Sequence, residues 1–233
     1  MRLATSADPA TCGVPAWSDS LHKVTRTRLD PRRELTRQAL VEAAEALFGQ
    51  DGIESVTVRQ IAAAVGSANK NVVSYHFGGK DALIDAVFRW RLPELDRTRG
   101  AMLDSVMQQG RADDPRALLE VLWRPTFDLV DRRGKRGFAM FLRAVLHDRY
   151  GHLRQSIREL TPHTERTSGL LLAISSGHCG ATAARRRIDL VSTMMLEAIS
   201  MADGAGAAEA ETAFADALTA AAAALLAPGR PAE

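Results

Sequence analysis

Apolar residues recur every three or four positions along most of the chain, which is the spacing of one face of a helix. The first such stretch runs from about Pro31 to Gln50, because Asp30 can cap the helix and proline suits its first position. Residues 1–29 lack this period and are expected to form a flexible tail. The apolar stripe of the first helix contains Leu40, Ala43, Ala44, Leu47 and Phe48.

A pair of short helices is predicted next. Thr57 and Gln60 have the spacing of a capping box, in which each side chain satisfies a free backbone amide at a helix start. Gly66 breaks that helix, and a second short helix is expected from about Asn69 to His76. Two short helices joined by a glycine-containing turn form a helix-turn-helix pattern. The second helix keeps Val72 and Val73 inward and leaves outward the polar side chains of Asn69, Lys70, Asn71 and Ser74.

Only helices are predicted beyond residue 80. Since no alternating segment is long enough for a sheet, the expected fold class is all-α. It consists of a three-helix, helix-turn-helix head at residues 30–80 and a larger helical domain at residues 81–233. The later helices are expected at about 81–109, 115–132, 138–150, 152–160, 164–175, 181–201 and 208–227.

The net charge of +2 is unevenly distributed. Residues 21–80 carry nine Lys and Arg against six Asp and Glu, whereas residues 81–233 carry twenty of each kind. A basic segment ahead of a compact unit indicates a polyanionic partner, although a solvated leader has the same composition. The cations concentrate near its start, at Lys23, Arg26, Arg28, Arg32, Arg33 and Arg37.

Several other protein classes lack support in the sequence. Cys12 and Cys179 have the spacing of neither a zinc site nor a redox pair, and the histidines lack the i, i+4 pairing of metal ligands on a helix. No metal or cofactor is therefore expected, and no motif indicates an enzyme. The longest apolar run, residues 220–227, is too short to cross a bilayer, and no signal peptide is evident. A cytoplasmic protein without membrane contact is expected.

One stretch of the sequence is highly distinctive. Residues 66–83 read GSANKNVVSYHFGGKDAL, preceded by TVRQIAAAV, and this region resembles the TetR family of bacterial transcriptional regulators. The resemblance covers about residues 32–88. The turn and second short helix together are one residue longer than the commonest family pattern, and Ser74 stands where an aromatic residue is usual.

The residue chemistry of the second short helix suits DNA. The amides of Asn69 and Asn71 can read an adenine edge in the major groove, although Asn69 can equally serve as a helix cap. Lysine, tyrosine and histidine side chains can donate to phosphate oxygens, and the amides at the helix start near Thr57 offer a further phosphate contact. The predicted DNA-binding residues are Thr57, Arg59, Asn69, Lys70, Asn71, Ser74, Tyr75, His76 and Lys80.

The resemblance implies a homodimer that presents two recognition helices one DNA turn, about 34–36 Å, apart. Two amphipathic stripes near the C-terminus fit a four-helix bundle shared by two chains, although they can also simply cover their own domain. The predicted interface residues are Ile188, Val191, Met195, Ile199, Phe214, Leu218 and Leu225.

The resemblance also implies an unknown small-molecule effector, often hydrophobic, bound between helices of the larger domain. The helix at 81–109 would carry the signal because it joins that domain to the head. Residues of this type are also ordinary core in any helical domain. The predicted ligand-binding residues are Trp123, Phe127, Phe138, Phe141, Leu142, Val145 and Tyr150.

Together these features predict a ligand-responsive, dimeric DNA-binding repressor, released from a palindromic double-stranded DNA operator by a small hydrophobic effector. Two alternatives remain open at this point. The chain can be an activator, because the operator's position relative to the promoter decides the sign. It can also be an all-helical ligand-binding or enzymatic domain whose head serves assembly.

Overall fold

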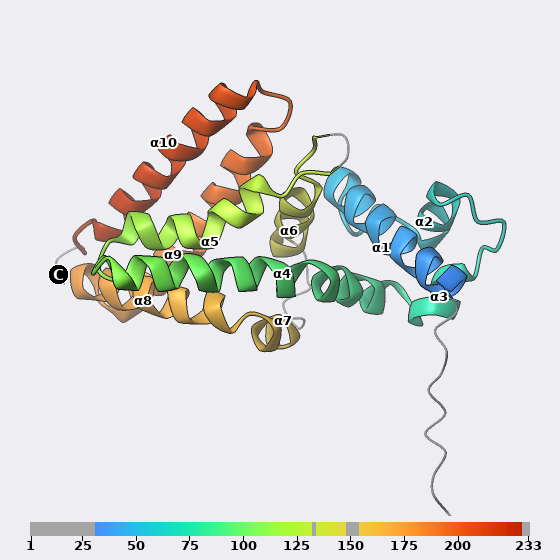
Figure 1. Ribbon diagram of the computed structural model, residues 1–233, viewed down its shortest axis with the longest axis horizontal. Helices are drawn as coiled ribbons and strands as arrows, with labels where there is room; N and C mark the ends of the chain where they lie inside the picture. The colour runs from blue at the N-terminus through green and yellow to red at the C-terminus, as the bar shows by residue number, and fades with distance from the viewer. Residues whose placement is uncertain (1–30, 132–133, 148–153, 230–233) are drawn as a thin grey trace, which may run out of the picture.

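The computed structural model describes residues 31–131, 134–147 and 154–229, and every regular element in these ranges is a helix. The predicted tail at residues 1–29 lies outside them. Figure 1 shows a small group of helices at one end of the molecule and a larger group at the other, with α4 extending between them. The helices are α1 (Pro31–Asp51), α2 (Val58–Ala64), α3 (Val72–Phe77), α4 (Lys80–Gln108), α5 (Pro115–Asp128), α6 (Gly137–His147), α7 (Arg154–Leu160), α8 (Pro162–Cys179), α9 (Ala181–Met201) and α10 (Ala207–Leu226).

The small group is the three-helix head, formed by α1, α2 and α3. The predicted capping box is present at the start of α2, where Thr57 and Gln60 each bond the other's backbone amide. Left-handed glycines then end both short helices, Gly66 with a φ of 70° and Gly78 with a φ of 86°. An L-residue would be strained at these angles, so the two glycines set the short lengths of α2 and α3.

The third helix begins later than the sequence pattern predicted. It starts at Val72 instead of Asn69, because local side-chain bonds hold the preceding residues in a turn. The Ser67 hydroxyl accepts from the Asn69 amide at 3.2 Å, and the Asn69 Oδ1 accepts from the Asn71 amide at 2.9 Å. Such bonds compete with helix geometry, so Asn69 and Lys70 lie in the turn and only Asn71 reaches the N-cap position.

One apolar core joins the head to the rest of the molecule. Phe48 of α1 and Phe88 of α4 both contact Phe141 of α6, with ring centroids 6.3 and 5.1 Å apart. Side chains of α2 and α3 complete this core from the head, namely Ile61, Ala62, Val72 and Val73. The head and α6 are thus packed around shared aromatic residues.

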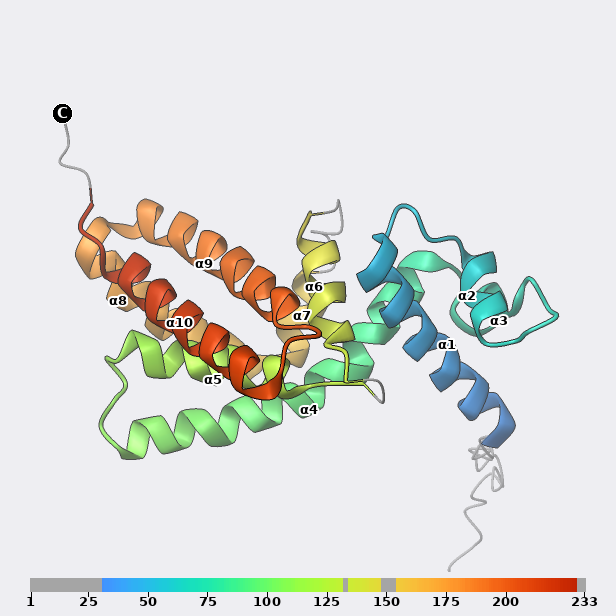
Figure 2. The same ribbon diagram turned by 90° about the horizontal axis from the view of Figure 1, so that it is seen from above.

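A second apolar core lies in the larger group of helices. It is formed mainly by α5, α8, α9, α10 and the C-terminal half of α4, together with Ala139 of α6. Figure 2 shows the ribbons of α9 and α10 side by side in this group. Phe127 of α5 stacks on Phe214 of α10 with ring centroids 4.3 Å apart. Leu142 of α6 packs against both cores, so α6 is the helix that lies between them.

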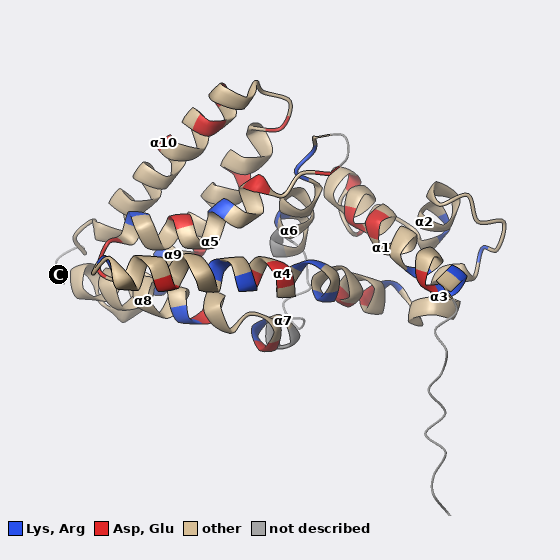
Figure 3. Ribbon diagram, in the orientation of Figure 1, with Lys and Arg blue, Asp and Glu red and all other residues tan. Residues whose placement is uncertain are grey.

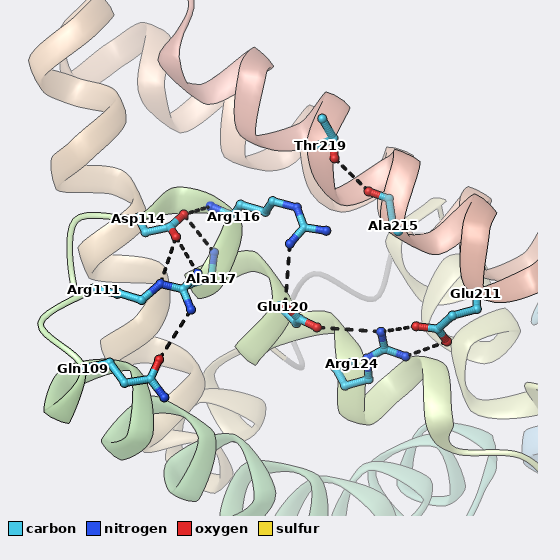
Figure 4. A network of polar contacts seen from close by, with 10 residues as sticks. All are labelled: Gln109, Arg111, Asp114, Arg116, Ala117, Glu120, Arg124, Glu211, Ala215 and Thr219. Atoms are coloured by element: carbon cyan, nitrogen blue, oxygen red, sulfur yellow. Dashed lines mark hydrogen bonds and ion pairs between the residues drawn. The ribbon is translucent and has the colours of Figure 1, made fainter.

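Polar contacts fix the ends of the helices in the larger group. Asp114 caps α5 by accepting from two backbone amides, and Arg124 of α5 forms a bidentate pair with Glu211 of α10 (Figure 4). The start of α8 is capped from a distance, because the buried Asp96 of α4 accepts from the amides of His163 and Thr164 at 3.0 and 2.8 Å. These bonds satisfy helix-end amides that would otherwise lack partners.

The junction between head and body is tight. Arg91 of α4 donates to the buried carboxylate of Glu45 in α1 through two nitrogens, at 2.6 and 3.1 Å. Burial raises the pKa of Glu45, while the bond and charge of Arg91 act in the opposite direction. One turn further along α1, a Cβ on Gly49 would stand 2.9 Å from the Met140 Cβ of α6. The absence of a side chain at Gly49 lets α1 and α6 approach this closely.

Candidate nucleic-acid interface

The helix-turn-helix separates apolar from polar side chains. Ile61 of α2 and Val73 of α3 are fully buried, and they hold the two short helices against α1 and α4. The opposite side of the pair is exposed to solvent. This exposed side carries the predicted DNA-binding residues Thr57, Arg59, Asn69, Lys70, Asn71, Ser74 and Tyr75.

Thr57 forms its hydrogen bonds within the capping box at the start of α2. Its Oγ1 accepts from the Gln60 amide at 3.3 Å and donates to the Gln60 Oε1 at 2.8 Å. The Thr57 amide in turn donates to the same Oε1 at 2.8 Å. The capping box therefore uses two of the groups that the sequence pattern assigned to a phosphate, and it makes the orientation of α2 rigid instead.

The two asparagines of the turn differ in what their side chains do. The side-chain carbonyl oxygen of Asn69 accepts from the Asn71 backbone amide, so this residue has the capping role that the sequence left open. Only the side-chain NH₂ group of Asn69 is left for another partner. Asn71 makes no side-chain cap bond and is exposed. Its whole amide is free to donate and accept, as bidentate reading of a base requires.

The C-terminal half of α3 carries an exposed aromatic ring next to two arginines of α1. The Tyr75 side chain is 67% exposed, and the guanidinium carbon of Arg33 lies 5.4 Å from its ring centroid. The guanidinium carbon of Arg37 lies 4.8 Å from the ring centroid of Phe77. The arginines of α1 thus place positive charge next to the exposed face of α3. Figure 3 shows blue Lys and Arg positions at the start of α1.

His76 lies between these two aromatic residues. Its ring meets Tyr75 edge-on, with centroids 5.1 Å apart. Partial burial lowers the pKa of His76, the charges of Arg33 and Arg37 lower it further, and Glu34 acts in the opposite direction. A neutral imidazole next to two arginines can still donate one hydrogen bond to a phosphate oxygen.

Lys80 stands at the first position of α4, two glycines after the end of α3. It is half-buried, and its Nζ lies 5.8 Å from the ring centroid of Phe48. The lysine stem thus covers the head core while its ammonium group stays at the edge of the polar surface. In the sequence, Arg33 and Arg37 belong to the basic segment at the start of the head. Their i, i+4 spacing on one helical face was the signal that could have assigned them to this surface.

The structure divides the predicted ligand-binding residues between two places. Phe138, Phe141 and Val145 are buried in the core shared with the head. Phe127 belongs to the second core, with Trp123 packed against it, and Leu142 contacts both. Tyr150 lies outside the described residues. The set is therefore divided between the two apolar cores, and on α6 Phe141 contacts Phe48 of α1 and Phe88 of α4.

The predicted dimer residues lie inside their own chain. Six of them are buried in the second core, with Met195, Ile199 and Leu225 fully inaccessible, and Ile188 packs against that core partly buried. The apolar stripes of α9 and α10 face each other, and they also face α5 and α8. They therefore cover the core of their own domain, which was one of the two alternatives for these stripes.

Two findings concern other kinds of site. Among the described residues, no group of three or more His, Cys, Asp or Glu side chains is placed to hold a metal ion. In the same part of the chain, no helix is both long and apolar enough to span a bilayer.

Known proteins resemble the head most clearly. The family described as bacterial regulatory proteins, tetR family, matches residues 40–87. The regulator BetI 2 of Chromohalobacter salexigens is 31% identical over 100 residues, 43% of this chain and 46% of that protein. The regulator BetI of Brucella anthropi is 39% identical over 82 residues, 35% of this chain and 39% of that protein. The chain thus aligns with less than half the length of these curated relatives.

A chain described as a TetR-family transcriptional regulator from Mesorhizobium loti is 18% identical, with a TM-score of 0.47 over 83% of this chain and 98% of that one. The matched segment, residues 40–87, begins in the middle of α1 and ends in α4. It contains the whole of α2, the turn and α3. Residues 40–87, which form most of this head, thus match the tetR family of bacterial regulatory proteins.

Proposed function

We propose that this protein is a homodimeric regulator that places the turn and α3 of each head in the major groove of a palindromic operator. The observation that carries the proposal is the division of α3 into two faces. Val72 and Val73 anchor the helix to the head, whereas Asn71, Ser74 and Tyr75 are exposed beside Lys70. A rigid helix with an amphipathic division of this kind can bring polar side chains to base edges.

Different residues of this face have different roles in the proposal. Asn71 reads a base, because its amide is exposed and free of any cap bond. Lys70 and Tyr75 donate to phosphate oxygens and fix the register without reading sequence. Asn69 contributes mainly to the shape of the turn, because its carbonyl oxygen is already bonded.

The experiment is retardation of the DNA upstream of the protein's own gene, with and without an excess of unrelated duplex. Specific retardation whose log affinity falls linearly with log salt supports DNA binding through phosphates. Absence of any preference over the competitor would instead favour an assembly role for the head.

Replacing Asn71 with Ala should weaken the free energy of binding by about 1–3 kcal/mol at the preferred site only, because one base contact is lost.

The dimer is proposed to form through outward positions of α9 and α10. These helices pack side by side at the end of the molecule away from the head (Figure 2). The outward face of α10 carries exposed alanines at 213, 220 and 224, and α9 exposes Leu190 with 70% of its surface accessible. Small side chains allow helices of two chains to approach closely, and twofold symmetry would then set the two heads one DNA turn apart.

Repression relieved by a small hydrophobic effector completes the proposal. Its support is the contact of α6 with α1, since displacement of Phe138 or Phe141 by a ligand would disturb Phe48 in the head. Compounds that raise the melting temperature would be tested for operator affinity, and a coupling of about 1–3 kcal/mol corresponds to roughly 5–150-fold weaker binding. If compounds that stabilise the protein leave its operator affinity unchanged, the proposed regulation by an effector is wrong.

Transcription in vitro from the operator's own promoter separates repression from activation.

A further inference from the structure

We infer that Arg33 and Arg37 of α1 form a second phosphate-binding surface beside α3, which extends the DNA contacts beyond the helix-turn-helix. The inference rests on the proposed function, because it assumes that the turn and α3 contact DNA. It adds a third helix of the head to the interface. It also assigns these two side chains to the DNA backbone and not to the bases.

The two arginines are held in place by aromatic rings of α3. They lie one turn apart on the exposed N-terminal half of α1, with guanidinium carbons 5.4 Å from the Tyr75 ring centroid and 4.8 Å from the Phe77 ring centroid. The ion pairs found within the described residues do not involve either side chain. Their charge is therefore available to an external anion.

The stacked arrangement suits a phosphate. A guanidinium that rests on an aromatic ring keeps its N–H groups at the edge of its plane, where they can form a bidentate contact with two phosphate oxygens. The ring also restricts the side chain before binding, which lowers the entropy lost on contact. Covering an apolar ring is a weaker explanation for Arg33, because Tyr75 is 67% exposed and needs no cover.

The electrostatics of α3 agree with this placement. Partial burial lowers the pKa of His76, the charges of Arg33 and Arg37 lower it further, and Glu34 of α1 raises it. Their combined positive field thus reaches the outward end of α3, next to Tyr75. A phosphate at this position would meet charge from two helices at once, in addition to Lys70 in the turn.

The test measures how binding depends on salt. Fluorescence anisotropy gives the affinity of the full chain for a duplex with its preferred site and for a scrambled duplex of equal length, over a series of KCl concentrations. The double variant R33Q/R37Q removes two phosphate contacts per bound chain. The slope of log affinity against log salt should become less negative by about 1.8 per bound chain, with the preference for the specific site retained.

Two control variants accompany it. R97Q/R116Q removes the same charge from exposed positions on α4 and α5 and should leave the slope unchanged. R33K/R37K keeps the charge and should retain the slope while weakening binding, because the bidentate contacts are lost. Thermal melting shows whether each variant is folded.

The remaining outcomes overturn the inference. An unchanged slope in R33Q/R37Q shows that no phosphate contact was lost, whatever happens to affinity. A lost preference for the specific site with an unchanged slope shows that the arginines only position α3. A lysine variant that loses the slope as fully as the glutamine variant shows that charge is not the cause. If the unmodified protein binds neither duplex, the proposed function itself fails, which is a different result.

Discussion

At the scale of single residues, Gly49 determines how closely the head approaches the body. A Cβ there would lie 2.9 Å from the Met140 Cβ, 3.0 Å from the Phe141 amide nitrogen and 3.1 Å from the Gly137 carbonyl oxygen. Two of these three atoms belong to the backbone of α6, which cannot rotate away as a flexible side chain can. The contact therefore has no room for even one methyl group.

We predict that Gly49→Ala lowers the free energy of unfolding by about 1–3 kcal/mol, because overpacking forces α1 and α6 apart. Gly169→Ala is the matched control, since a Cβ at this position in α8 meets nothing within 4 Å. It should be neutral or stabilising by about 0.5–1 kcal/mol through helix propensity. Urea unfolding of both variants measures the difference. Equal stability of the two would show that the α1–α6 contact is not tight.

The stability of the folded chain should depend on pH through His76. Its pKa in the folded chain lies below the ordinary value of 6.5, through partial burial first and then through Arg33 and Arg37. The unfolded chain binds a proton more readily, so the stability from a neutral His76 is present above about pH 6.5 and is lost as pH falls toward the folded-state pKa. The melting temperature of His76→Gln should therefore fall less than that of the unmodified protein between pH 7 and 5. An equal fall in both would contradict the prediction.

At the scale of elements, Arg136 ties the start of α6 to the turn between α9 and α10. Its side chain donates to the Phe127 carbonyl at 2.9 Å and to the Ala202 carbonyl at 3.2 Å, and its backbone amide donates to the Asp203 carboxylate at 2.9 Å. The guanidinium carbon also lies 4.2 Å from the Phe127 ring centroid. Arg136 thus connects the end of α5 and the start of α6 to the turn between α9 and α10, which is more than 60 residues further along the chain.

Removal of this side chain should destabilise the larger domain. We expect Arg136→Ala to lower the free energy of unfolding by about 2–4 kcal/mol, because two carbonyls lose their side-chain donor and Asp203 loses the guanidinium that lies 3.7 Å from its Oδ1. Asp203→Ala and the double variant complete a mutant cycle measured by urea unfolding. Additive effects of the two single changes would show that the side chains act independently.

Much of the element order could be predicted from local signals. The helix from Pro31, the capping box at Thr57 and the break at Gly66 each depend on residues close in sequence, and the structure confirms them. The start of α3 was placed too early, because the side-chain bonds of Ser67 and Asn69 compete with helix formation in a way that periodicity does not reveal.

Long-range packing could not be predicted in the same way. An apolar stripe shows which face of a helix is buried but not which partner buries it. Phe141 therefore fitted a ligand site as well as it fits its observed contacts with Phe48 and Phe88. The same holds for Phe138, which stacks on Phe141 in this core. The stripes of α9 and α10 likewise fitted a dimer surface, whereas in the structure Val191 and Phe214 belong to the core of their own chain.

At the scale of the whole molecule, the head has two connections to the body. One is α4, which is continuous from Lys80 beside α3 to the second core. The other is α1, which contacts α6 at Gly49 and is paired with α4 through Glu45 and Arg91. Two separate attachments restrict the rotation of the head, so a change in the position of α6 would be transmitted to the DNA-binding surface even if α4 stayed fixed.

The proposed twofold assembly depends on the outward face of α10. Ala220 lies near the centre of this face, between Ala213 and Ala224, and is exposed in the single chain. We predict that Ala220→Arg yields a monomer by sedimentation velocity at micromolar concentration, because a long charged side chain prevents close helix approach without disturbing the chain's own core. Operator binding should weaken, since one head alone makes half of the contacts. Ala101→Arg on the exposed face of α4 is the control and should remain a dimer. A dimer that persists in Ala220→Arg would place the interface on another face of the molecule.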